Sequence, residues 1–269
     1  MKILKSFIAF LLISLFLTAP AWAADLLINT LEEPPGSFTD TSGKLTGISV
    51  DMVREIQSRV GNTDPIRVYP WARTYQNTLK RPNVVAFTAT RTPERENKFH
   101  WITKVTRKKY TFFARKKTPI TLTSLDDAKR LKAIGVLRSS VWEQQLTARG
   151  FTNLDPVATH ELNLKKLMAG RFPAIYYASD AIFQHCRNPG IDCDAIYPVY
   201  TTPIVEAYII MSKNGTSMAL VNQWKTAADD IKQDKTFEKI AKKWARYVNR
   251  QNGFEAHYAD GALNFWKKE

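Results

Sequence analysis

The chain alternates short apolar runs with amphipathic stretches of helical period, and this alternation most constrains its fold. Residues 49–60, for example, place apolar side chains at helical spacing and end at Gly61. Alternating strands and helices predict α/β architecture with parallel sheets and crossover helices. The expected strands are residues 25–30, 66–69, 84–88, 110–115, 131–137, 154–157, 174–177, 195–199 and 206–211. The expected helices are residues 49–60, 73–79, 141–149, 162–169, 180–186, 218–232 and 236–248.

The order of these elements predicts two lobes. Two extended segments, residues 110–115 and 206–211, bracket a self-contained set of strands and helices. A chain of this kind leaves the first lobe, builds the second and returns, which creates a hinge. We therefore predict lobe 1 from residues 24–112 plus 207–269 and lobe 2 from residues 113–206. Ligands of open α/β sheets bind where strand ends and helix starts converge, so the cleft between the lobes is the expected site. The tail after Asn249 can pack on lobe 1 or extend freely.

The N-terminus has the pattern of a secretory signal peptide over residues 1–23. Lys2 and Lys5 precede an apolar run over residues 7–17 and the small-residue motif Ala21-Trp22-Ala23. This run is shorter than the roughly 20 residues that a membrane-spanning helix needs. We expect cleavage near Ala24 and a soluble periplasmic protein, and a retained membrane anchor is the alternative. No cysteine follows the cleavage site, which argues against a lipid anchor.

The two cysteines lie close together around a turn signal. Cys186 and Cys193 flank Asn188-Pro189-Gly190. In an oxidising compartment this arrangement predicts a disulfide that closes a small loop, and two free thiols are the alternative. The four histidines show no metal-ligand spacing, so no metal site and no other cofactor are expected.

The chain is strongly basic, with a net charge of +14. Loss of Lys2 and Lys5 with the signal peptide leaves +12. Such a charge admits nucleic acid, acidic surfaces or anionic ligands as partners. Export removes the chain from nucleic acid, and the basic residues are spread through amphipathic helices such as residues 232–246. No nucleic-acid partner is expected, and most of this charge forms a solvated surface that also concentrates anions near a cleft.

Several segments together resemble family 3 of the extracellular solute-binding proteins. They are Gly43-Lys-Leu-Thr-Gly-Ile-Ser-Val-Asp51, Thr88-Ala-Thr-Arg-Thr-Pro-Glu-Arg-Glu96, Phe99-His-Trp101, Ile134-Gly-Val-Leu137 and Lys239-Ile-Ala-Lys-Lys-Trp244. The resemblance covers nearly the whole mature chain. It implies a two-lobed periplasmic-binding-protein fold (type II), each lobe a mostly parallel sheet flanked by helices, joined by a two-segment hinge. It also implies a monomer that delivers a polar amino acid or related molecule to an inner-membrane ABC permease.

Arg95 is the first candidate ligand-binding residue. It follows the expected strand over residues 84–88, and a guanidinium at a cleft edge can pair with a carboxylate through two parallel hydrogen bonds. In proteins similar to this one, the arginine at this place holds the ligand's α-carboxylate, and positions matching Thr88 and Thr90 face the ligand. The alternative for Arg95 is a surface ion pair with Glu94 or Glu96.

Ser139, Ser140 and Trp71 are further candidates. The two serines lie between the expected strand over residues 131–137 and the next helix, where free N–H groups can bind an anion. Plain N-capping by these serines is compatible with that role. Trp71 follows the expected strand over residues 66–69, where the family places an aromatic residue against the ligand. Packing in the core is the alternative for Trp71.

Two positions depart from the family pattern. Glu33 lies in the first loop where amino-acid binders carry an aromatic residue. Ala178 stands where the resemblance implies an aspartate that pairs with the ligand's α-ammonium. Burial of an ammonium without a counter-charge is costly, so either Glu32, Glu33, Asp180 or Glu206 replaces the aspartate or the ligand is no ordinary α-amino acid. We therefore predict a small carboxylate-bearing ligand, either an amino acid or a related organic acid.

Two other function classes remain open. Some proteins of this architecture are secreted enzymes similar to cyclohexadienyl dehydratase, and such chemistry needs a general acid or base in the cleft. Glu33 is the best candidate, but the spacing reveals neither paired carboxylates nor a nucleophile with its base. We therefore expect a binding protein with no catalytic residues. A ligand-sensing protein without a transport role is the third alternative.

Overall fold

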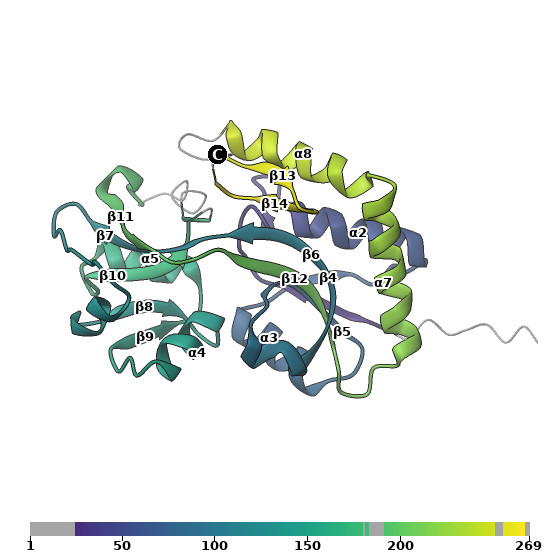
Figure 1. Cartoon of the computed structure of the whole chain (residues 1–269), viewed down its shortest axis with the longest axis horizontal. Helices are drawn as coiled ribbons and strands as arrows, with labels where there is room; N and C mark the ends of the chain where they lie inside the picture. Colours follow the sequence, from purple (N-terminus) through teal and green to yellow (C-terminus); the bar gives the residue numbers. More distant parts are fainter. Residues whose placement is uncertain (1–24, 180, 183–190, 251–254, 267–269) are drawn as a thin grey trace, which may run out of the picture.

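The computed structural model describes residues 25–179, 181–182, 191–250 and 255–266, and it folds into two α/β lobes (Figure 1). The predicted two-lobed fold is confirmed. The signal peptide, most of the helix predicted over residues 180–186 and Cys186 lie outside the described residues, so these remain predictions. Within the described parts of the chain, no helix is both long and apolar enough to span a bilayer.

Lobe 1 is built on a seven-stranded sheet in the order β13-β14-β6-β12-β5-β1-β4. The strands are β1 (Leu27–Thr30), β4 (Ile66–Val68), β5 (Val84–Thr90), β6 (Phe99–Lys108), β12 (Val205–Ser212), β13 (His257–Ala259) and β14 (Ala262–Asn264). The helices are α2 (Ile48–Val60), α3 (Trp71–Lys80), α7 (Met218–Gln233) and α8 (Thr236–Asn249), with the 3-10 helix η1 (Pro93–Lys98). Residues of α2, α7 and α8 share one apolar core with the sheet, while α3 packs into a separate aromatic cluster.

Lobe 2 is built on a five-stranded sheet in the order β11-β7-β10-β8-β9. The strands are β7 (Tyr110–Arg115), β8 (Ile134–Leu137), β9 (Leu154–Val157), β10 (Ala174–Ala178) and β11 (Ile196–Thr201). The helices are α4 (Val141–Ala148) and α5 (His160–Met168), with the 3-10 helices η2 (Asp126–Arg130) and η3 (Cys193–Ala195). The central strands β8, β9 and β10 pair in parallel, whereas β7 is antiparallel to β10 and β11.

Two crossings join the lobes. The chain leaves the large sheet at the end of β6 and enters the small sheet at the start of β7 after Lys109 alone, and it returns through residues 202–204 into β12. Figure 1 shows β6 and β12 running toward lobe 2 side by side. Residues 110–112, which we predicted for lobe 1, lie in β7 of the small sheet. Both sheets are mixed, with less parallel pairing than expected, because β12 is antiparallel to β5 and β6 in the large sheet and β7 is antiparallel to β10 and β11 in the small one.

The first loop of lobe 1 is fixed to the start of α2 by a glycine. Gly47 has a φ of 131°, and a Cβ at this position would lie 2.3 Å from the carbonyl oxygen of Gly36. Only glycine adopts this conformation at such a close approach. The two-stranded hairpin of β2 (Phe38–Thr39) and β3 (Leu45–Thr46) belongs to the same loop region. The loop therefore stands at a defined place beside the cleft.

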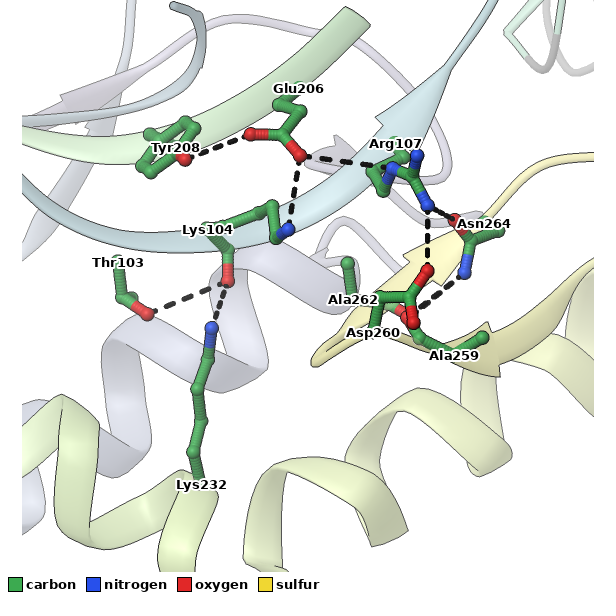
Figure 2. A network of polar contacts seen from close by, with 10 residues as sticks. All are labelled: Thr103, Lys104, Arg107, Glu206, Tyr208, Lys232, Ala259, Asp260, Ala262 and Asn264. Carbon is green, nitrogen blue, oxygen red and sulfur yellow. Dashed lines mark hydrogen bonds and ion pairs between the residues drawn. The ribbon is translucent and has the colours of Figure 1, made fainter. Parts of the chain in front are cut away.

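The C-terminal tail packs on lobe 1 and contacts the hinge strands (Figure 2). Strand β14 extends the large sheet by parallel pairing with β6. Arg107 of β6 donates hydrogen bonds to Asp260, at 3.1 Å, and to the side-chain oxygen of Asn264, at 3.3 Å. Glu206 of β12 accepts from Lys104 of β6 at 3.0 Å. The tail thus adds one strand pair and a polar network to the lobe 1 end of the hinge.

Candidate ligand-binding site

The cleft between the lobes contains two adjoining chambers. The inner chamber has a volume of about 30 Å³ and the outer chamber about 790 Å³. The smaller volume holds roughly one or two water molecules, so the lobes are nearly closed around it. Lobe 1 lines the inner chamber with Leu31, Glu33, Trp71, Thr88, Thr90 and Arg95, and lobe 2 with Tyr110, Leu137, Ser140, Val141, Trp142, His160 and Tyr176.

Arg95 carries the main charge of the inner chamber. It lies in η1, just beyond the end of β5, and its residue is only 1% exposed. Its guanidinium donates to Gln144 Oε1 at 3.2 and 3.4 Å and to the Ser139 carbonyl at 3.4 Å, all across the cleft. The ring centroids of Tyr75 and Trp71 lie 4.7 and 5.8 Å from its Cζ. Burial lowers the pKa of Arg95 to about 10.

The guanidinium of Arg95 therefore faces neutral acceptors at long distances. Among the described residues, no carboxylate forms an ion pair with it. The alternative of a surface ion pair with Glu94 or Glu96 is not found among the described residues, and Glu96 accepts from Arg91 at 2.8 Å instead. A buried cation without a counter-ion is costly, and an anion placed here would relieve that cost. The arrangement is suited to a carboxylate bound by the planar guanidinium.

Strand β5 reaches this chamber with a distorted backbone. Thr88 has a φ of 63°, which is unusual for a β-branched residue. Its hydroxyl donates to the Phe87 carbonyl at 2.6 Å. The register of β12 on β5 shifts between Tyr208 and Ile210, beside this residue. Such backbone conformations cost about 1–3 kcal/mol and concentrate at binding sites. Thr88 and Thr90 both line the chamber, where the sequence placed them.

The start of α4 closes the chamber from lobe 2. Ser140 is the N-cap, and its hydroxyl accepts from the Glu143 N–H at 3.1 Å. The Ser139 N–H donates to the Glu143 carboxylate, so this N–H is not free for the anion that we predicted there. The Ser139 carbonyl instead accepts from the Trp71 indole at 2.9 Å. Ser140 thus lines the chamber as a cap, while Ser139 and Trp71 connect the two lobes.

Trp142 is a candidate binding residue that sequence reasoning missed. It is 8% exposed, its ring centroid lies 4.1 Å from that of Tyr110, and its buried indole Nε1 has no hydrogen-bond partner within the described part of the chain. An unsatisfied buried donor costs about 1–3 kcal/mol, so a ligand acceptor would satisfy it. Tyr110, Tyr176 and His160 were missed as well, because they lie on strands or a helix start with no motif of their own. The signal that the sequence offered was the position of Trp142, which directly follows the Ser139-Ser140-Val141 turn.

The acidic candidates are already engaged on the protein itself. Glu33 lines the inner chamber and forms an ion pair with Lys108 at the end of β6, and the two residues are 7% and 3% exposed. Glu32 accepts from the Thr39 hydroxyl at 2.6 Å. Glu206 belongs to the hinge network in Figure 2. Asp180, the remaining candidate, lies outside the described residues.

Ala178 lies at the end of β10, opposite Tyr110 of β7, and is fully buried. It is not among the described residues that line either cleft chamber. Its methyl group supplies no charge at the position where the family resemblance implies an aspartate. The structure shows Ala178 packed at the end of β10, and the ligand-binding role that we predicted for this position stays a prediction.

The outer chamber opens in front of the inner one. Leu31, Trp71, Leu137 and His160 line both chambers, so the two spaces adjoin. Lobe 1 lines the outer chamber with Glu32, Pro34, Phe38, Thr39, Asp40, Thr41, Val68, Tyr69, Pro70 and Tyr247, and lobe 2 with Ala158, Thr159 and Glu161. A ligand that reaches Arg95 from this side passes through the outer chamber.

Comparison with known families supports the same architecture. Residues 26–247 match the model of the bacterial extracellular solute-binding proteins, family 3. The chain belongs to this family. The resemblance carried by the segments around Gly47 and Arg95 is thus confirmed. Family 3 proteins are extracellular solute-binding proteins, which agrees with a two-lobed fold that encloses a cleft.

Several solved structures share this family 3 fold. A histidine kinase sensor domain with similarity to periplasmic binding proteins aligns with a TM-score of 0.72 and 19% identity, covering 81% of this chain and 95% of that chain. A mutant of ArgBP from T. maritima aligns at 0.70 and 16%, covering 81% and 94%. An ancestral arginine-binding protein bound to arginine aligns at 0.69 and 22%, covering 81% and 97%. No match is found among curated protein sequences.

Proposed function

We propose that this family 3 protein captures a small carboxylate-bearing ligand in the periplasm and presents it to an inner-membrane ABC permease. The observation that carries the proposal is Arg95, which is 1% exposed and whose guanidinium donates to neutral acceptors alone among the residues that the structure describes. The family supports a binding role. A similar structure, at 16% identity, is the substrate-binding protein of an amino acid ABC transporter, which supports the transport part of the proposal.

The ligand carboxylate replaces the long contacts of Arg95. In the bound state, two guanidinium N–H groups donate to the two carboxylate oxygens, and the contacts to Gln144 and Ser139 give way. The indole N–H of Trp142, which has no acceptor among the described residues, adds a donor from lobe 2. A ligand held by residues of both lobes binds the closed form better than the open form, and this difference shifts the population toward closure.

The residues that line the inner chamber are better suited to ligand binding than to acid–base catalysis. Among the described residues that line it, Glu33 is the single carboxylate, and it is ion-paired with Lys108. Dehydratase chemistry needs a positioned group that accepts and returns a proton. A similar structure, at 17% identity, is an ancestral amino acid-binding protein described as a precursor of cyclohexadienyl dehydratase, so the enzyme alternative is kept in the test below. From the lining of the inner chamber, we expect a bound ligand to be released unchanged.

The test is ligand binding by the mature protein after unfolding and refolding, which removes any co-purified ligand. A panel pairs L-amino acids with amine-free carboxylic acids, and thermal unfolding followed by calorimetric titration finds those that bind. A ligand at about 100 times its dissociation constant stabilises by roughly 2.7 kcal/mol. For a ligand found in this way, Arg95→Met should weaken binding by about 1.5–3 kcal/mol or more.

Arg91→Met is the matched control, because Arg91 forms an exposed pair with Glu96 close by. Its affinity should stay within about threefold of wild type. If no carboxylate binds, or if Arg95→Met binds as well as wild type, the proposed site is wrong. Conversion of the bound ligand to a new product would favour the enzyme alternative. If cells that lack the gene for this protein take up the ligand as fast as wild-type cells, the sensing alternative is favoured.

A further inference from the structure

The two cleft chambers differ in size in a way that bears on the shape of the ligand. The inner chamber, at about 30 Å³, has room only for a small group beside Arg95. The outer chamber, at about 790 Å³, lies within the range of roughly 300–1,000 Å³ for sites that enclose drug-sized molecules. A ligand whose carboxylate lies on Arg95 therefore projects its remaining atoms past Trp71 and into the outer chamber.

The outer chamber carries negative charge. Glu32, Asp40 and Glu161 line it, and the described lining includes neither lysine nor arginine. This is unusual in a chain with 39 basic and 25 acidic residues. Glu32 and Asp40 come from lobe 1, whereas Glu161 comes from α5 in lobe 2. Carboxylates from both lobes thus meet one space, and a cation placed between them would reduce their mutual repulsion when the lobes close.

Each of these carboxylates is held in place by its own lobe. Glu32 accepts from the backbone N–H of Thr39 at 3.0 Å, and Asp40 accepts from the Ser42 hydroxyl at 2.6 Å. Glu161 pairs with the exposed Lys165 at 2.6 Å. Within the described ranges of the chain, none of the three carboxylates has a hydrogen bond or ion pair across the cleft. The acidic groups are therefore positioned before a ligand arrives.

Aromatic rings line the same space. Phe38, Tyr69, Trp71 and Tyr247 contribute to its wall. The ring of Tyr69 already carries the guanidinium of Arg73, whose carbon lies 4.0 Å from the ring centroid, so a ligand cation would lie against the other rings of this wall, Phe38, Trp71 and Tyr247. Rings combined with carboxylates bind ammonium and guanidinium groups through cation–π and charge interactions. The cleft therefore has a positively charged end at Arg95 and, in the outer chamber, an end lined by carboxylates and aromatic rings.

We infer that the outer chamber takes the cationic end of an elongated zwitterion whose carboxylate lies on Arg95. The class comprises molecules in which an ammonium or guanidinium group is several bonds away from a carboxylate, so that one end lies in each chamber. This inference rests on the proposed function, because it assigns the carboxylate to Arg95. It adds the second charge of the ligand and the residues that recognise it, Glu32, Asp40 and Glu161.

The test uses ω-aminoalkanoic acids of increasing chain length, with alkanoic acids and dicarboxylic acids of equal length as matched probes. Affinities are measured by calorimetric titration on the mature full-length protein. At the chain length that binds best, the ω-aminoalkanoic acid should bind at least tenfold more tightly than the alkanoic acid of equal length. The dicarboxylic acid of that length should bind most weakly of the three. The advantage should be absent for the shortest members, which cannot reach the outer chamber, and it should fall as salt is raised.

A triple variant, Glu32→Gln, Asp40→Asn and Glu161→Gln, tests the residues. It should lose the advantage of the ω-amine and keep the affinity for alkanoic acids within about twofold. Glu238→Gln is the control, because Glu238 forms an exposed pair with Lys242 on α8. Thermal unfolding of the triple variant without ligand confirms that it folds.

The outcomes separate this inference from the proposed function. If alkanoic acids and ω-amino acids bind equally and both need Arg95, the inference is wrong and the proposed function stands. An equal loss of affinity for both classes in the triple variant also contradicts the inference. If no carboxylate of any length binds, or if binding ignores Arg95→Met, the proposed function itself fails.

Discussion

Arg95→Met should make the ligand-free protein more stable, although it removes the main binding group. The pKa of Arg95 falls from 12.5 to about 10, with burial as the largest cause. At 1.36 kcal/mol per pKa unit, the charged form costs the folded state about 3 kcal/mol relative to the unfolded chain. Methionine has a flexible unbranched side chain that can fill the same space without this cost.

The gain from Arg95→Met is partly offset by lost contacts. The guanidinium lies over the rings of Tyr75 and Trp71, and its hydrogen bonds of 3.2–3.4 Å cross the cleft. Cation–π contacts contribute about 0.5–2 kcal/mol, and hydrogen bonds this long contribute little. We therefore expect the free energy of unfolding to rise by about 1–3 kcal/mol. Replacement of buried ions by apolar side chains has effects of this size.

The assay is urea unfolding of wild type, Arg95→Met and Arg91→Met without ligand at pH 7. Arg95 is charged in both the folded and the unfolded chain at this pH, so the full cost is present. A group whose pKa is lower in the folded state binds fewer protons there, and wild-type stability should recover only as the pH rises above about 10. The difference between wild type and Arg95→Met should hence be constant from pH 6 to pH 9.

Saturating ligand should reverse the order of stability, because only wild type gains the binding energy. Arg91→Met should stay within about 1 kcal/mol of wild type, as expected for an exposed pair. The reasoning is refuted if ligand-free Arg95→Met is less stable than wild type by more than about 1 kcal/mol. Arg95 would then be a structural residue whose contacts outweigh its burial.

Three further predictions concern the scaffold. Burial lowers the pKa of Lys232 to about 8, so its charge costs stability below that pH. In urea unfolding, the free energy of unfolding of wild type should therefore rise by roughly 1–2 kcal/mol relative to that of Lys232→Met between pH 7.5 and 9.5. A difference that stays constant over this range would contradict the prediction. Asn264→Leu removes buried donors to three backbone carbonyls of the tail hairpin and should lower the unfolding free energy by about 1.5–3 kcal/mol, with no change meaning that the tail adds nothing. Gly135→Ala places a methyl group 2.1 Å from Asn163 Oδ1 and 2.6 Å from the Phe172 ring, so thermal unfolding should show a loss of about 1–3 kcal/mol or more, whereas a loss below about 0.5 kcal/mol would show that both neighbours move freely.

The sequence predicts much of the lobe 1 side of the site, because local order along the chain determines it. Thr88 and Thr90 lie at the end of β5, Arg95 follows that strand and Trp71 follows β4, so the order of strand ends brings them to one edge. The predicted helix over residues 49–60 lies at 48–60, with Gly61 in the left-handed conformation that ends it. Such features depend on period and turn chemistry, which a single sequence carries.

The hinge and the lobe 2 side were harder to predict. Strand β6 was missed because its buried residues include threonines and Lys108, which is 3% exposed and pairs with Glu33. Only Lys109 separates β6 from β7, so no turn signal marks the change of sheet. Trp142 and Tyr176 reach the chamber because the two lobes close on each other. That closure depends on long-range packing, which neither periodicity nor a local motif reports.

Burial of Arg95 also explains how closure can depend on ligand. Closing the cleft places Gln144 and Ser139 of lobe 2 over this guanidinium, so closure adds to the burial that lowers its pKa to about 10 and disfavours its charged form. The contact between Trp71 and the Ser139 carbonyl recovers part of the cost of this burial. A bound carboxylate supplies the missing counter-charge, so the same residue that binds the ligand opposes closure without it. A partner that recognises the closed form would then distinguish loaded protein from empty protein.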